Sequence, residues 1–133
     1  MATVNQAADL APDAWSGVVA AFDTFLDVVA DPAYQRLCWV EGPTALGFEE
    51  WWECGERHEI GLIRSQLDRA AEAGLLQVED RDMLAHVLYG AVAAGVLGMA
   101  RSEQPTVVRE RFRTVMLELV SGLVHLPPGP LPG

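Results

Sequence analysis

The sequence contains no lysine, and its basic residues are nine arginines set against nineteen acidic residues. The formal net charge of the 133-residue chain is therefore −10. Proteins that bind nucleic acid contact the phosphates through clustered cations. This charge balance argues against a nucleic-acid-binding domain, and we expect the chain alone to bind no nucleic acid.

Cysteine is scarce as well, since Cys38 and Cys54 are the only two and cannot form a disulfide framework in a chain of this length. The N-terminus lacks the cationic region and apolar run of a secretory signal. Residues 83–100 carry no Asp, Glu, Lys or Arg, but they are rich in Ala and Gly and only weakly hydrophobic for a membrane span. We expect a buried helix there, no membrane association, and a reduced, cytoplasmic protein.

Common cofactor and metal motifs are also missing, among them GxGxxG, a Walker-type loop, CxxC and HExxH. Glu50, Cys54 and His58 stand at i, i+4 and i+8, on one stripe of an expected helix. That stripe spans about 12 Å, which is too long for one ion to bind all three side chains. We expect no cofactor and no metal, with Cys54 and His58 left as half of a possible site.

The charge is unevenly distributed along the chain. Residues 1–60 have a net charge of −9, from eleven acids and two arginines, whereas residues 61–133 have a net charge of −1. An acidic first half could repel anions or attract cations. The simpler interpretation is a set of solvated helix faces that keep the protein soluble.

Apolar residues recur in steps of three and four almost throughout, which predicts an all-α fold of five helices. The expected helices cover residues 12–30, 32–41, 43 or 47 to 73, 79–101 and 106–125. Asp31 and Pro32 form a helix start, Gly42-Pro43 is expected to break the second helix, and Gly74 is the expected left-handed residue after the third. The Pro- and Gly-rich tail, residues 126–133, ends the helical pattern.

The helices at 79–101 and 106–125 are apolar on more than one face, and a chain of this size cannot easily cover them. We therefore expect a twofold-symmetric homodimer in which these helices form a four-helix bundle. The alternative is one helix buried centrally within a single subunit. The residues expected at the dimer interface are small or apolar: Val87, Ala91, Ala94, Gly95, Gly98, Val108, Phe112, Val115 and Leu119.

Residues 37–53, LCWVEGPTALGFEEWWE, combine an aliphatic run, an acidic-Gly-Pro turn and a Trp-containing helix. This segment resembles the C-terminal regulatory domain of the TetR (tetracycline-repressor-like) transcriptional regulators. The Asp31-Pro32 helix start and the two closing helices are similar to that family too, so the resemblance covers about residues 10–125. It implies a linker remnant at 1–11 and a ligand-binding and dimerisation domain at 12–125, without the family's N-terminal helix-turn-helix.

The resemblance also implies an effector pocket between the first three helices. Aromatic residues around the turn suit an apolar pocket, although large aromatics also dominate ordinary cores. His58, Glu59, His86 and Tyr89 are polar groups that could converge on it. The residues that we expect to contact a ligand are Phe22, Trp39, Phe48, Trp51, Trp52, His58, His86 and Tyr89.

The function expected from the sequence is binding of a small apolar or aromatic effector, together with homodimerisation, in a TetR-like regulator. The sequence has no spacing typical of a Ser-His-Asp or Cys-His nucleophile, so we assign no catalytic residue. The alternative is a stand-alone protein that acts as an enzyme on, or carrier of, a small hydrophobic metabolite, because a fold does not determine its function.

Overall fold

A computed structural model describes residues 2–124, apart from the side chains of residues 2, 3 and 5. Its elements are all helical: α1 (Ala2–Leu10), α2 (Ala14–Val29), α3 (Pro32–Gln35), the π-helix η1 (Arg36–Glu41), α4 (Gly42–Leu46), α5 (Phe48–Glu72), α6 (Arg81–Arg101) and α7 (Pro105–Ser121). Within that range the structure has no strand, and Leu76 and Val124 form an isolated β-bridge. The all-α prediction is confirmed, while the predicted tail at 126–133 lies outside the described residues.

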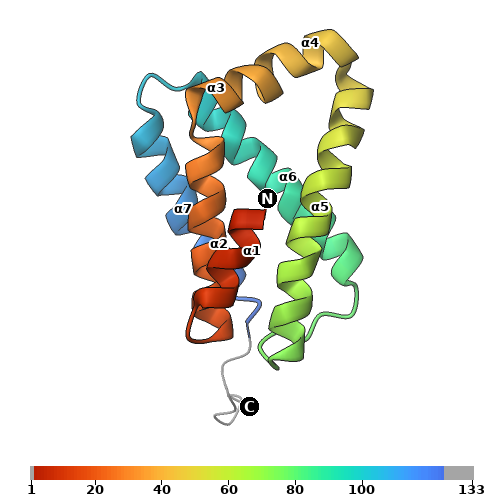
Figure 1. The fold of residues 1–133 in the computed structure, drawn as a ribbon, viewed down its shortest axis with the longest axis vertical. Helices are drawn as coiled ribbons and strands as arrows, with labels where there is room; N and C mark the ends of the chain where they lie inside the picture. The colour runs from red at the N-terminus through yellow and green to blue at the C-terminus, as the bar shows by residue number, and fades with distance from the viewer. Residues whose placement is uncertain (1, 125–133) are drawn as a thin grey trace.

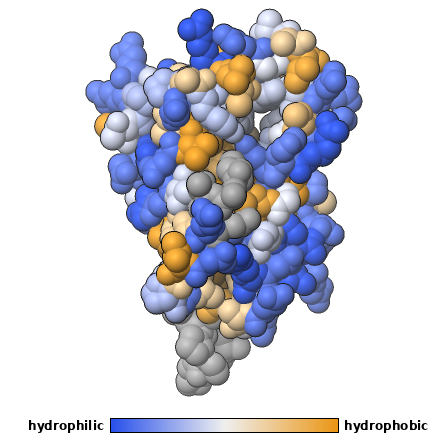
Figure 2. Space-filling view, in the orientation of Figure 1, coloured by the Kyte–Doolittle hydropathy of each residue, from blue (hydrophilic) through white to orange (hydrophobic). Residues whose placement is uncertain are grey.

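The helices enclose a shared core between α2, α5, α6 and α7 (Figure 1). α1 and α2 form a hairpin, and α5 stands on the other side of α1 in this view. The segment from α3 to α4 bridges α2 and α5 at one end of the molecule, while α6 crosses behind them. The hydrophilic residues cover most of the face in Figure 2, and hydrophobic residues gather there in separate patches.

The first helix is part of this packed structure. Residues 1–11 were predicted to be a linker remnant, and α1 packs along α2 with Val4 and Ala8 buried in the core. An ion pair of 2.5 Å between Asp9 and Arg69 also joins α1 to α5. The segment therefore helps to form the interior.

Several predicted helix ends are confirmed by their capping geometry. The carboxylate of Asp31 accepts a hydrogen bond of 2.8 Å from the backbone N–H of Ala33, and Pro32 begins α3. α5 ends at Glu72, and Gly74 follows with φ +77°, in the left-handed region.

The predicted break at Gly42-Pro43 is wrong, because the chain stays helical as far as Leu46. Pro43 is the second residue of α4 and follows directly on the π-helical turn of η1, in which the N–H of Gly42 bonds to the carbonyl of Leu37 five residues earlier. This wider turn accommodates the proline within a continuous helical run. The actual break is at Gly47, whose φ of +83° is readily adopted only by glycine, and α5 begins at the next residue.

α6 is the central helix of the fold. By length and composition it is apolar enough to cross a membrane, with a mean hydropathy of 1.7. However, 44% of that stretch is buried inside the protein, and the helix packs against both α5 and α7. Its most deeply buried residues, Val96 and Met99, are 0% and 1% exposed. This arrangement is typical of a core helix.

Ion pairs join the acidic first half of the chain to the arginines of the second half. Arg113 contacts Asp23 through two hydrogen bonds of 2.5 and 3.0 Å, and Arg109 contacts Asp27 at 2.5 Å. Both pairs tie α7 to α2. They are partly exposed, so they orient the two helices more than they stabilise the fold.

Candidate ligand-binding site

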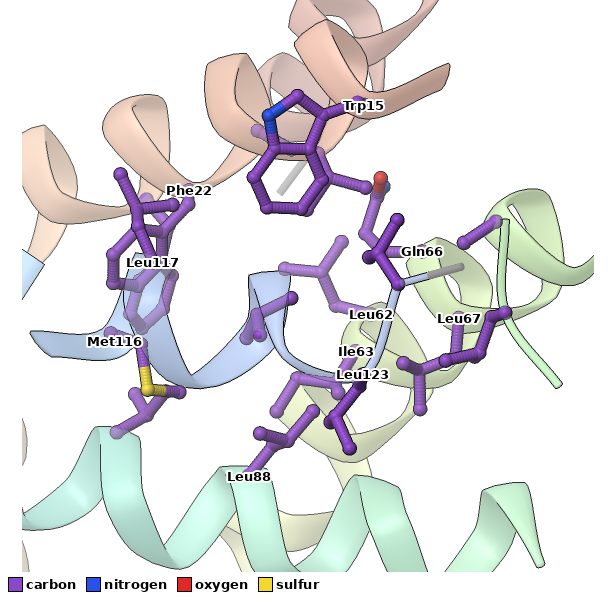
Figure 3. A pocket seen from close by; sticks show the side chains of 18 of the residues that line it. Trp15, Phe22, Leu62, Ile63, Gln66, Leu67, Leu88, Met116, Leu117 and Leu123 are labelled. Atoms are coloured by element: carbon purple, nitrogen blue, oxygen red, sulfur yellow. The ribbon is translucent and has the colours of Figure 1, made fainter. Parts of the chain in front are cut away.

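An apolar cavity of about 130 Å³ lies between α2, α5, α6 and α7 (Figure 3). α1 and the loop before α6 complete its wall. Its lining is almost wholly aliphatic or aromatic: Val4, Trp15, Val18, Ala21, Phe22, Phe25, Glu59, Leu62, Ile63, Gln66, Leu67, Ala70, Leu75, Leu76, Leu88, Val92, Met116, Leu117, Val120, Leu123 and Val124.

Helical spacing places these side chains on facing stripes. On α2, Trp15, Val18, Phe22 and Phe25 follow one another by three or four residues, so they share a face. Figure 3 shows Trp15 and Phe22 on this helix across the space from Leu62 of α5. The cavity is therefore formed where the apolar faces of separate amphipathic helices meet without filling the space between them.

Glu59 is the ionisable residue among the described residues that line the cavity, and it is only 8% exposed. Its Oε1 accepts a hydrogen bond of 3.3 Å from the hydroxyl of Tyr34. Its Oε2 is buried without a hydrogen-bond partner among the residues that the structure describes. Burial raises the pKa of the Glu59 carboxyl, and the Tyr34 hydrogen bond and the charge of His58 oppose that increase. Burial, with the nearby Glu59 charge, also raises the pKa of Tyr89 to about 12.

The raised pKa makes Glu59 a source of pH-dependent stability. A carboxyl whose pKa is higher in the folded state stabilises the fold below its unfolded pKa, and this contribution is lost as pH rises through the folded pKa. We expect Glu59→Gln, which cannot ionise, to be more stable than the wild type at pH values where the Glu59 carboxyl is ionised, because the amide buries no charge.

Thermal unfolding of both proteins across a pH series checks this prediction. The difference in Tm should grow as pH rises and shrink towards zero near the ordinary carboxyl pKa. A difference that is independent of pH would show that burial of the Glu59 charge is not its cause.

Among the predicted ligand contacts, Phe22 lines the cavity, and the other seven residues do not. Five of those seven form what we call the aromatic cluster: Trp39, Phe48, Trp51, Trp52 and Tyr89. Their ring centroids are 5.0–6.2 Å apart in a connected series that joins η1, α5 and α6. Contact of these residues with a ligand stays a prediction.

The aromatic cluster explains the distinctive turn of the sequence. The indole N–H of Trp51 donates a hydrogen bond of 2.5 Å to the backbone carbonyl of Cys38. A Cβ at position 42 would lie 2.9 Å from the same indole, so Gly42 permits this close approach. Together with Gly47, these contacts fix the corner between η1 and α5.

The two predicted histidines lie at exposed positions away from the cavity. The Nδ1 atom of His58 lies 2.9 Å from the carbonyl oxygen of Cys54, and Nδ1 of His86 lies 2.8 Å from that of Asp82. Both rings thus contact their own helix backbone one turn earlier. In the described part of the chain, no group of three or more His, Cys, Asp or Glu side chains could hold a metal ion.

The sequence predictions missed most of the cavity wall. Trp15 and Glu59 were considered but not chosen, and the aliphatic residues of α5 and α7 were treated as core. The apolar stripes of α2 and α5 could have indicated the cavity, because they face each other across it. The prediction relied instead on the number of aromatic residues near the turn at residues 42–47.

The residues predicted at a dimer interface fall into two groups. The first group packs within the subunit: Gly95 lies against the ring of Phe112, Gly98 lies near Val108, and the half-buried Ala91 packs against the core. The exposed residues of the set form the second group: Val87, Ala94, Val115 and Leu119.

The fold and cavity together define an all-α domain with an apolar interior pocket. A family model described as tetracyclin repressor-like, C-terminal domain, matches residues 15–123. The chain therefore belongs to the TetR-like family as its C-terminal domain. No curated protein matches the chain with significance.

Solved structures support the fold assignment. A TetR-family transcriptional regulator from Pectobacterium atrosepticum superposes with a TM-score of 0.78 over 94% of this chain, at 21% sequence identity. At this identity the similarity establishes the fold. The present chain spans 64% of the length of that regulator.

Proposed function

We propose that the protein binds a small apolar or aromatic effector in the cavity between α2, α5, α6 and α7, and that it dimerises as the regulatory part of a TetR-like, cytoplasmic transcriptional regulator. The observation that carries the proposal is an apolar cavity in a domain of this family. Ligand pockets in proteins are typically mostly apolar with a few polar groups, and dry apolar cavities bind apolar molecules.

The cavity wall suggests how occupancy would be communicated. Val4 of α1 lines the cavity, and the Asp9–Arg69 ion pair links the same helix to α5. A ligand that fits one arrangement of α1 better than another would shift the population between them. In an intact regulator, such a shift would change the geometry of the segment that carries the DNA reader.

The surface of α6 and α7 supports the dimer part of the proposal. Val87, Val115 and Leu119 are 59%, 60% and 50% exposed. Ala94 is also exposed and lies two helical turns after Val87 on α6. Apolar side chains that share helix faces and stay exposed are typical of protein interfaces. A second copy of this chain would cover them by twofold symmetry.

Titration with N-phenyl-1-naphthylamine, a neutral dye that fluoresces in apolar surroundings, tests the ligand site. We expect saturable binding at one site per chain. Val18→Phe should weaken it at least tenfold, because the larger side chain fills the cavity that the dye needs.

Val19→Phe is the matched control, since Val19 is the next residue on α2, is also partly buried and does not line the cavity. Its affinity should stay close to that of the wild type. Equal binding by the two variants would place the site elsewhere, with the aromatic cluster as the next candidate.

A further inference from the structure

The cavity holds one feature that an apolar ligand alone does not explain. Glu59 of α5 forms part of its wall, is only 8% exposed, and has its Oε2 buried without a hydrogen-bond partner among the described residues. A buried carboxylate without a partner is costly, so natural structures rarely keep one without a reason.

The described residues around Glu59 include one hydrogen-bond donor to its carboxylate and no basic side chain within the cavity wall. The hydroxyl of Tyr34 donates to Oε1, and no Arg or His is among the described residues that line the cavity. His58, the neighbouring residue on α5, is exposed, and its Nδ1 lies 2.9 Å from the carbonyl oxygen of Cys54. Cys38 of η1 and Tyr89 of α6 are the further titratable groups whose electrostatic interaction with Glu59 is resolved. Within the described part of the chain, no cation lies inside the cavity to pair with this carboxylate.

We infer that the cavity is specific for a protonated lipophilic amine whose N–H groups bind Oε2 of Glu59 while its apolar body fills the remaining space. This inference deepens the proposed function and rests on it. An ammonium group supplies both the donor and the positive charge that the site lacks, and such charge-assisted hydrogen bonds are the strong ones.

The aromatic wall of the cavity suits the same ligand class. Trp15, Phe22 and Phe25 line the side formed by α2. The faces of such rings attract cations, and they also accommodate flat or aliphatic apolar groups. A carboxylate ligand would instead meet the charge of Glu59 in a poorly solvated space, so anions should be rejected.

Three probes of nearly equal size separate these possibilities: 1-naphthylmethylamine, 1-naphthalenemethanol and 1-naphthoic acid, which are cationic, neutral and anionic near neutral pH. Binding is measured by calorimetry with the full chain. We expect the amine to bind at least tenfold more tightly than the alcohol, the usual gain for a hydrogen bond to a charged group, and the acid to bind most weakly.

Glu59→Gln removes the charge and keeps the shape, so it should abolish the preference for the amine while leaving the affinity for the alcohol within about threefold. Glu56→Gln is the matched control, because Glu56 lies one turn earlier on α5 and does not line the cavity. It should retain the full preference. Thermal unfolding verifies that both variants fold.

The outcomes distinguish this inference from the proposed function. Alcohol and amine binding with equal affinity, or a preference for the amine that survives Glu59→Gln, would overturn the ligand class and leave the cavity as a binding site. Binding of all three probes that Val18→Phe does not weaken, or no binding of any probe, would overturn the proposed site and this inference with it.

Discussion

Val115→Glu combined with Leu119→Glu should dissociate the proposed dimer into monomers. Val115 and Leu119 are 60% and 50% exposed, and their spacing of four residues places them on one face of α7. In a twofold interface each residue meets the same surface of the partner, so the double variant brings four new charges into a desolvated region. We expect the dimer Kd to rise at least a hundredfold, or about 3 kcal/mol. Sedimentation equilibrium measures it directly.

The control carries the same change of charge on a different surface. Leu37 and Val40 of η1 are 63% and 60% exposed, and neither belongs to α6 or α7. Replacing both with glutamate should leave the association constant unchanged. A wild-type protein that sediments as a monomer at micromolar concentration would contradict the dimer, and a double variant at 115 and 119 that stays dimeric would move the interface to another face.

The helical architecture could be predicted because each long helix carries its own local signals. α2, α5, α6 and α7 have apolar residues at helical spacing, and Asp31 and Gly74 act at helix ends as their residue types indicate. The predicted break at Gly42-Pro43 was wrong because a π-helical turn just before it lets the chain stay helical through the proline. Whether a proline follows or begins a helical turn depends on the chain around it, and the π-helix before Gly42 is such a context.

The cavity could not be located from local patterns, because an unfilled space depends on how far apart four helices pack. Phe22 was predicted to contact a ligand and lines the cavity, yet Trp51 and Trp52 came from the same reasoning and lie in the aromatic cluster. Both sets are aromatic residues on amphipathic helices, and only the tertiary arrangement separates them. Glu59 was visible in the sequence as an acid within an apolar stripe, which is the kind of local conflict that often marks a functional position.

The close packing of α6 on α7 leads to the largest stability effect that we expect from a single substitution. A Cβ atom at Gly95 would overlap the ring of Phe112. That ring cannot move away freely, because it packs on Phe22 of α2 with a centroid separation of 5.8 Å. Gly95→Val should therefore lower the free energy of unfolding by about 3 kcal/mol, the upper range for overpacked interiors.

Gly61→Val on α5 is the matched control, since a side chain there meets no atom within 4 Å and the position is exposed. Urea unfolding should show little loss for Gly61→Val. Alanine sharpens the contrast, because it is favoured over glycine in helices by about 1 kcal/mol. Gly61→Ala should be stabilising and Gly95→Ala should not. A stabilising Gly95→Ala would mean that α6 and α7 pack less closely than in this structure. The part of the cavity wall that α7 forms through Met116 and Val120 would then lie in a different position.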